Sequence, residues 1–375
     1  MIVFFLPNGI GDLLMSLPVL RRLIVLRGID NVRVVVSNAT QSLLLKKLID
    51  PRVRTIERYG ALYFSQFKLW VRLFFMRADW IFAPLLSTKK INKIFFATLL
   101  TNTLVPSSLM RERLFLLRPS KECLSKFKGH QTNFYVEFLA EILSDIDKKI
   151  VVASELLPPG MVANNARMLK PIVAKVVVGV SCGVLERHKI PQVEMFVSLL
   201  RALSEQKNIE LLLIGSLSDE HLLNTLIRNL PPSLQVEKLI DSPIDVVIKR
   251  MADCHLGISG TTGQGHMMAA AGLPILVLAG VTNPHESGPY VDRAAVLRHR
   301  YACGPCYQEN YRFGCGQVDC MNTLDVAEGV SLACQLIDSN EFGFGWMLSS
   351  PKFSNVSLDA RMAIHSRPIE KWISP

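Results

Sequence analysis

The stretch "FFLPNGIGDLLMSLPVL", residues 4–20, decides how the chain begins to fold. It overlaps the apolar start Ile2–Leu6, which predicts a buried strand, then turns through two glycines and continues with leucines at helical spacing. Val32–Val36 predicts a second strand, so the chain opens as a β-α-β unit. Pro18 lies inside the predicted helix and is expected to kink it or to restart it.

The glycine turn does not complete a dinucleotide-binding fingerprint. The G-x-G-x-x-G pattern needs a third glycine where this chain has Leu14, and no acidic residue follows the second strand about 20 positions later. What remains is Asp12 at the start of a helix, beside Gly9 and Gly11, which allow a ligand to approach the backbone closely. Two interpretations stay open: a carboxylate that caps the helix, and a general base at the carboxyl end of a strand.

Length and charge bound the class of protein. A chain of 375 residues, of which 49% are hydrophobic and 20% charged, is long enough for two globular domains. Its formal charge of +10 favours anionic partners: a nucleotide, a phosphorylated lipid, a nucleic acid or a membrane surface. No apolar stretch approaches the roughly 20 residues of a membrane span, and polar residues interrupt the N-terminal run too early for a signal peptide. We therefore expect a cytoplasmic protein.

The chain divides into two predicted domains, residues 1–160 and 172–338, with a proline-containing stretch between them and a tail, residues 339–375, that the pattern does not place. In the second domain, strands alternate with helices, which predicts a parallel sheet covered on both faces. The predicted strands there are Val173–Ser181, Ile209–Ile214, His255–Ser259 and Pro274–Leu278. The predicted helices are Val193–Leu203, His221–Leu230, Ile244–Met251 and Gly263–Ala271.

Residues 60–118 interleave aromatic and aliphatic side chains with lysine and arginine. One interpretation is a set of core helices with basic outer faces. The other is a basic, apolar surface that meets anionic lipid, as interfacial helices do. A short strand is also predicted within this region, at Trp80–Ala83.

A second glycine-rich loop, Gly257–Tyr290, follows a predicted strand and enters a helix of small residues that carries His266. The backbone amides and the dipole of such a helix start form a site for an anion, here at Gly263, and the hydroxyls of Thr261 and Thr262 can add donors. The dense pattern favours a diphosphate cradle over a merely tight turn.

The stretch Ser181–Pro191 also follows a strand and carries Arg187, His188 and Lys189. A cation at this position could face a diphosphate, and ordinary surface charge is the alternative.

Four cysteines form a cluster in the sequence, with the spacing C-x2-C-x8-C-x4-C: Cys303, Cys306, Cys315 and Cys320. Thiolates in two close pairs can bind zinc or iron tetrahedrally. Reduced thiols, or a disulfide formed on oxidation, are the alternatives. The remaining four cysteines lie apart from this cluster and are expected to pack in the interior.

Together these segments resemble the ADP-heptose:lipopolysaccharide heptosyltransferase family, glycosyltransferase family 9. The likeness runs from about residue 2 to 337. It rests on four motifs in the right order: Gly9-Ile10-Gly11-Asp12 followed by Leu17-Pro18-Val19-Leu20, "HQTNFYVEFLAEIL" at residues 130–143, "TTGQGHMMAAAGLPILVLAGVTNPHESGPY" at residues 261–290, and the Cys-x2-Cys segment.

The resemblance implies an α/β protein of GT-B architecture, with two Rossmann-like doubly wound domains facing a central cleft. It implies an inverting transfer of a sugar from a nucleotide-diphosphate donor, with Asp12 as the general base and the turn at Gly9 and Gly11 on the acceptor side. It assigns the donor to the C-terminal domain, where the expected donor-binding residues are Ser181, Arg187, Lys189, Thr261, Thr262, Gly263 and His266. Helix amides and a cation can stabilise the leaving diphosphate, so no cofactor is required for catalysis, and zinc or iron at the cysteines would be structural.

Two departures from the family pattern concern the donor. Thr261 stands where the family usually has an aspartate, and the family's K-x-W-P appears as His188-Lys189-Ile190-Pro191. The expected function is transfer of heptose from ADP-heptose to a cell-envelope saccharide such as the lipopolysaccharide core, with peripheral contact to the inner face of the cytoplasmic membrane and no nucleic acid partner. The alternatives are heptosylation of secreted proteins, known among relatives with cysteine-bound iron, and a non-catalytic binder of nucleotide-sugar or lipid.

Overall fold

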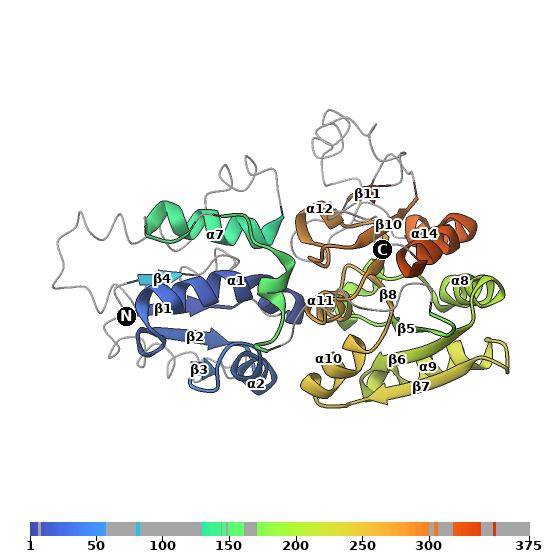
Figure 1. Cartoon of the computed structure of the whole chain (residues 1–375), viewed down its shortest axis with the longest axis horizontal. Helices are drawn as coiled ribbons and strands as arrows, with labels where there is room; N and C mark the ends of the chain where they lie inside the picture. The colour runs from blue at the N-terminus through green and yellow to red at the C-terminus, as the bar shows by residue number, and fades with distance from the viewer. Residues whose placement is uncertain are drawn as a thin grey trace, which may run out of the picture. The chain divides into compact units, whose positions relative to one another are not determined.

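The computed structural model describes residues 1–6, 9–57, 80–82, 130–143, 145–147, 149–160, 171–299, 304–306, 318–338 and 348–349. The chain divides into two compact units, Met1–Met161 and Val162–Pro375 (Figure 1). Almost all of the basic segment 60–118, two of the clustered cysteines and most of the tail lie outside the described residues. Each unit is built on its own parallel sheet, which confirms the predicted α/β class.

The first unit contains a four-stranded sheet in the order β3-β2-β1-β4, in which all neighbouring strands are parallel. Apolar runs produce the two inner strands, and three described α-helices accompany the sheet. The elements are β1 (Ile2–Phe5), α1 (Ile10–Arg27), η1 (Ile29–Asn31), β2 (Val32–Val36), α2 (Ala39–Leu48), β3 (Arg54–Glu57), β4 (Trp80–Phe82), α7 (Gln131–Ile142) and η2 (Ala153–Leu156).

Helix α1 is buried along most of its length because it packs against α7 and also contacts β2 of the sheet (Figure 1). It runs as one helix from Ile10 to Arg27, so the predicted restart at Pro18 is wrong. The Pro18 ring is itself buried. Packing of the surrounding leucines stabilises the helix enough to offset the backbone hydrogen bond that proline cannot donate.

Two arginines of α1 hold the end of the first unit in place. The Arg21 guanidinium donates to the carbonyl oxygens of Leu48 and Leu157, each at 2.6 Å, and also to that of Glu155. Burial lowers the pKa of Arg21, an effect that the charge of Glu155 partly offsets. Arg22 forms an ion pair with Glu155 at 2.7 Å. The chain that leaves the unit is therefore tied to the same helix that begins at the glycine turn.

The second unit contains a seven-stranded parallel sheet in the order β11-β10-β9-β8-β5-β6-β7. Its strands are β5 (Ala174–Gly179), β6 (Ile209–Gly215), β7 (Gln235–Ile240), β8 (Leu256–Gly260), β9 (Ile275–Ala279), β10 (Ala294–Arg298) and β11 (Leu348–Ser349). Its helices are η3 (Val184–Lys189), α8 (Val193–Gln206), η4 (Leu217–Asp219), α9 (Glu220–Arg228), α10 (Ile244–Ala252), α11 (Gly263–Ala270), α12 (Pro284–Ser287), α13 (Asp319–Asn322) and α14 (Val326–Asp338).

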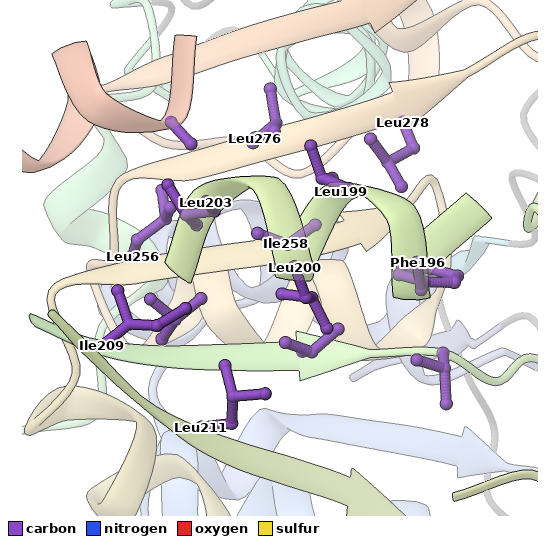
Figure 2. Close-up of a cluster of buried hydrophobic side chains, with 14 of the residues drawn as sticks. Phe196, Leu199, Leu200, Leu203, Ile209, Leu211, Leu256, Ile258, Leu276 and Leu278 are labelled. Carbon is purple, nitrogen blue, oxygen red and sulfur yellow. The ribbon is translucent and has the colours of Figure 1, made fainter. Parts of the chain in front are cut away.

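Helices cover both faces of this sheet. On one face, α8, α9 and α14 share an apolar core with alternate residues of the strands. Figure 2 shows this core, in which side chains of α8 cluster with strand side chains: Phe196, Leu199, Leu200 and Leu203 with Ile209, Leu211, Leu256, Ile258, Leu276 and Leu278. On the other face, α11 packs on β8 and β9 beside α10. Gly257 makes this contact possible, because an added Cβ would lie 2.8 Å from the Met268 sulfur.

Strand order places the candidate site. Counted from β5, the sheet runs outward through β6 and β7 on one side and through β8, β9 and β10 on the other, which is the doubly wound arrangement. Ligands bind such sheets beyond the carboxyl ends of the strands where the order reverses, here β5 and β8. In the first unit the same reversal falls at β1, directly before the glycine turn.

Among the described helices, none is both long enough and apolar enough for a membrane span.

Candidate functional site

The glycine turn of the first unit presents Asp12 at the start of α1. Gly9 is the N-cap residue, with φ −83°, and Asp12 is the third residue of the helix. An added Cβ on Gly9 would lie 2.9 Å from Asp12 Oδ2, so the carboxylate folds back over this glycine. The helix dipole stabilises a negative charge in this first turn. Because Gly9 and not Asp12 is the N-cap, the carboxylate can stabilise the helix through its dipole, and its use as a general base remains a prediction.

Gln41, which the sequence analysis did not single out, braces this turn from α2. Its side chain is buried, with 1% exposure. Its Nε2 donates to the Gly9 carbonyl oxygen at 3.4 Å, and its Oε1 accepts from the Ser37 amide at 2.7 Å. One amide group therefore joins the segments that follow β1 and β2.

The "HQTNFYVEFLAEIL" motif forms α7 and brings a phenol close to Asp12. His130 is the N-cap, and its Nδ1 accepts from the Thr132 amide at 3.1 Å. Tyr135 is fully buried and accepts a hydrogen bond from Gln131 Nε2. Burial, and then the negative charge of Asp12, raise the pKa of Tyr135 well above its usual value, so the phenol stays protonated.

In the second unit, one amide group connects the ends of β5 and β6 to the first turn of α11. Gln264 Nε2 donates to Ser181 Oγ at 2.9 Å and to the Ile214 carbonyl oxygen at 3.0 Å. Its Oε1 accepts from the Ser181 amide at 3.1 Å. Ser181, a predicted site residue, is therefore brought against the helix start that follows Thr262.

Hydroxyl groups gather at the ends of β8 and β9. Thr261 Oγ1 and Thr282 Oγ1 are 2.5 Å apart, and both residues are buried. Ser259 Oγ and Thr262 Oγ1 are 3.4 Å apart. Thr262 is the N-cap residue of α11 and Gly263 its first residue, so the predicted helix start is in place. The loops after β8 and β9 thus meet through neutral hydroxyls.

The predicted cations lie on η3 after β5. Lys189 is the last residue of this helix, and its Nζ is 2.5 Å from Glu186 Oε1. An added Cβ on Gly260 would overlap the Lys189 carbonyl oxygen, so the end of η3 lies directly against the last residue of β8. Arg187 is exposed. Lys189 is therefore the cation that the fold brings to the end of β8.

His266 is buried in α11 and remains neutral. Its pKa is lowered to about 4, first by burial and second by the nearby positive charge of Lys189, while a hydrogen bond with the Ser287 backbone opposes these effects. A neutral imidazole can donate one hydrogen bond and accept one, but it adds no charge at neutral pH. The positive charge in this region thus comes from Lys189 and not from His266.

The low pKa of His266 predicts a loss of stability in acid. The folded-state pKa lies below the usual 6.5, so the unfolded chain binds more protons as the pH falls from about 6.5 to 4. This group alone then costs about 3 kcal/mol of unfolding free energy at pH 4 relative to pH 7. His266→Gln removes that part of the pH dependence, measured by urea unfolding at both pH values. An unchanged pH dependence in the variant would contradict the buried, neutral state.

The cysteine cluster is described only in part, because Cys303 and Cys315 lie outside the described residues. Cys306 and Cys320 are buried in one small cluster with Val281 and Met321. This cluster lies against the loop after β9, where an added Cβ on Gly280 would be 2.7 Å from the Cys320 sulfur. Within the described ranges, no three His, Cys, Asp or Glu residues form a group that could hold a metal ion. A metal at the four cysteines therefore remains a prediction.

The structure therefore joins several predicted residues and adds others. Ser181, Thr261, Thr262, Lys189 and His266 all lie around the ends of β5, β8 and β9. The residues that sequence reasoning missed are Gln264, Thr282, Glu186 and Ser287 in this unit and Gln41 in the first. The "TTGQG" motif contains Gln264, but only the positions of its partners reveal what its amide does.

Comparison with known proteins agrees with this geometry. The family model for glycosyltransferase family 9 (heptosyltransferase) matches residues 163–316. A search of curated proteins finds no match.

Solved structures share the fold. The chain is similar to the ADP-heptose lipopolysaccharide heptosyltransferase II of E. coli, with TM-score 0.61 and 18% identity over 90% of this chain and 98% of that one. E. coli heptosyltransferase WaaC with ADP-2-deoxy-2-fluoro heptose gives a TM-score of 0.55 and 16% identity over 79% and 92%. The iron-containing dodecameric glycosyltransferase TibC of enterotoxigenic E. coli gives 0.51 and 12% over 89% and 75%.

Each identity is low, so these structures support the fold, while the family match covers the part of the chain that contains the post-β5 and post-β8 loops. Residues 163–316 therefore match the glycosyltransferase family 9 model, and the solved structures show that the chain shares the fold of heptosyltransferases.

Proposed function

We propose that the chain is an inverting glycosyltransferase. The proposed sugar is heptose, which it transfers from an ADP-linked donor to a saccharide of the lipopolysaccharide core. The observation that carries this proposal is the convergence, inside the matched domain, of a helix start, buried hydroxyls and Lys189 at the carboxyl ends of β5 and β8. Such a combination suits the diphosphate of a nucleotide sugar.

On the donor side, the proposed task is to stabilise a leaving diphosphate. The first amides of α11 point along the helix axis and carry partial positive charge, and Lys189, which is ion-paired with Glu186, adds a cationic side chain. The hydroxyls of Ser181 and Thr262 supply further donors. Because the negative charge on the diphosphate grows as its bond to the sugar breaks, these groups stabilise the transition state more than the ground state.

On the acceptor side, the proposed base is Asp12. Its carboxylate takes the proton of the acceptor hydroxyl as that oxygen attacks the anomeric carbon from the face opposite the diphosphate. The new C–O bond forms, the bond to the phosphate oxygen breaks, and the electron pair leaves with the nucleoside diphosphate. The configuration at the anomeric carbon inverts, and the proton on Asp12 then passes to solvent.

A donor screen tests the reaction class. The full chain is incubated with ADP-heptose and, in parallel, with UDP-, GDP- and other ADP-linked sugars, together with a truncated lipopolysaccharide acceptor. Mass spectrometry of the acceptor is expected to show a gain of one heptose with ADP-heptose. A product with another donor would change the sugar but keep the reaction, whereas no product with any donor would contradict the proposal for this acceptor.

Acceptor class is the second variable. The similarity to the iron-containing glycosyltransferase TibC motivates a parallel arm in which a secreted protein replaces the saccharide.

The proposed site of action is the cytoplasmic face of the inner membrane, with the basic segment 60–118 in peripheral contact with anionic lipid. Co-sedimentation with vesicles that contain anionic lipid, but not with neutral vesicles, is the expected result.

The cysteine cluster is proposed to hold a structural zinc or iron that stabilises the chain after β9. Elemental analysis of the purified full chain is expected to find about one metal ion per chain, since four thiolates complete one tetrahedral site. The paired change Cys303→Ser and Cys306→Ser should remove it. Cys334→Ser, on α14 and away from the cluster, serves as the matched control and should retain it. Equal metal content in all three proteins would contradict the site.

A further inference from the structure

The amide of Gln264 has only one possible orientation. The Ser181 backbone N–H can only donate a hydrogen bond, so the Gln264 atom that it meets at 3.1 Å must be the oxygen. The Ile214 carbonyl oxygen can only accept, so the atom that it meets at 3.0 Å must be the nitrogen. Two backbone groups from different strand ends thus fix the amide, independently of any serine hydroxyl.

This orientation decides the direction of the Ser181 hydroxyl. Gln264 Nε2 lies 2.9 Å from Ser181 Oγ, and because the amide nitrogen can only donate, the hydroxyl oxygen accepts. The serine proton is then directed elsewhere. Among the described residues, Gln264 is the only hydrogen-bond partner of the Ser181 hydroxyl. The hydroxyl is therefore arranged to donate to an acceptor that the protein itself does not supply.

The surroundings hold Gln264 in this place. An added Cβ on Gly179 would lie 2.8 Å from Gln264 Oε1 and 2.9 Å from Ser259 Oγ, so β5 leaves room for the amide only because it carries glycine there. Ser181 is 9% exposed, and its hydroxyl lies at the end of β5 beside the first turn of α11. A ligand at this end of the sheet would meet a hydroxyl with a fixed direction.

We infer that Gln264 is a positioning residue of the donor site: it presents the Ser181 hydroxyl as a hydrogen-bond donor to a phosphate oxygen of a nucleoside diphosphate. The inference rests on the proposed function, because it requires that a diphosphate binds at this end of the sheet. It adds that an amide at position 264 is needed for that binding, through Ser181 and not through contact with the ligand.

A double-mutant cycle on the full chain tests the coupling. Gln264→Met removes the amide at similar side-chain volume, and Ser181→Ala removes the hydroxyl. Dissociation constants for ADP, UDP and GDP are measured by calorimetry for the wild type, both single variants and the double variant. We expect each single change to weaken binding of the preferred diphosphate about tenfold, as for the loss of one hydrogen bond to a charged group. In the Ser181→Ala background, Gln264→Met should then weaken binding less than about twofold.

The cycle separates a positioning role from a structural one. If Gln264 only braces the loops, Gln264→Met weakens binding by the same factor with or without the Ser181 hydroxyl, and the inference is overturned. Unchanged binding by Gln264→Met alone also overturns it. Gln335→Met is the matched control, because this glutamine lies on the exposed side of α14 with an amide bonded only to a neighbouring serine in the described chain, and it should bind like the wild type.

Failure of the proposed function would look different. If none of the three diphosphates binds the wild-type chain, the donor site itself is wrong, and the inference falls with it. If the wild type binds one of them and the cycle is additive, the donor site stands and only the role of Gln264 is lost.

Discussion

Asp12→Asn is expected to lower kcat by about 10²- to 10⁴-fold, the range over which a general base contributes, while the KM for the donor stays within about threefold. The substituted amide has the same shape and keeps the same position over Gly9, but it cannot take the acceptor proton. Initial rates at saturating donor and acceptor measure the effect, and binding of the nucleoside diphosphate measures the intact donor site.

The same isosteric change at an exposed carboxylate provides the control. Asp30 lies on η1 after the C-terminal end of α1, with a side chain that is 78% exposed and an ion pair to Arg54. Asp30→Asn should leave kcat unchanged. If Asp12→Asn retains the wild-type rate, or if it lowers the melting temperature by more than about 5 °C, Asp12 acts as a helix-stabilising residue and the proposed base is wrong.

Gly260→Ala is expected to weaken binding of the donor nucleotide about tenfold or more and to lower the unfolding free energy by about 2–3 kcal/mol. The added methyl group would overlap the Lys189 carbonyl oxygen and lie 3.2 Å from Ile190 Cγ1. A backbone oxygen cannot move aside by changing rotamer, so the end of η3 must shift, and Lys189 shifts with it. Calorimetric titration with the nucleotide and urea unfolding measure the two effects.

Gly183→Ala is the matched control because this glycine lies at the other end of η3. Its backbone, with φ −55°, suits alanine, and the nearest atom to an added Cβ is Glu186 Oε2 at 3.9 Å. Wild-type binding and stability are expected for this variant. If Gly260→Ala also binds the nucleotide like the wild type, the contact between β8 and η3 does not position the donor site.

Most inner strands of both sheets could be predicted from sequence, and so could the edge strand β4, but the inner strand β10 and the edge strands β3 and β7 could not. Strands β5, β6, β8 and β9 have neighbours on both sides and helices on both faces, so their sequences are mostly apolar. Strands β3 and β7 lie at sheet edges, and their sequences, "RTIE" and "QVEKLI", are largely exposed or half-exposed. Polar residues are tolerated there, so the apolar signal on which the prediction relied is weak.

The candidate site divides in a similar way. Motifs identify Asp12 and the helix start at Thr262 because the residues that make up each motif lie close together in the chain. Gln264 could not be interpreted in advance, because its partners Ser181 and Ile214 are 83 and 50 residues away. The pairing of Thr261 with Thr282 likewise appears only when the loops after β8 and β9 are brought together. Sequence spacing carries no information on which side chains meet across strands.

The bonds of Gln264 also bear on the entropy of binding. A glycine-rich loop that is ordered only by its ligand loses backbone freedom at the moment of association, and affinity falls accordingly. Here the backbone at Ser181 and Ile214 is already held by a side chain of the protein. That conformational entropy is lost during folding, so an arriving nucleotide meets a preorganised surface and gives up chiefly its own freedom.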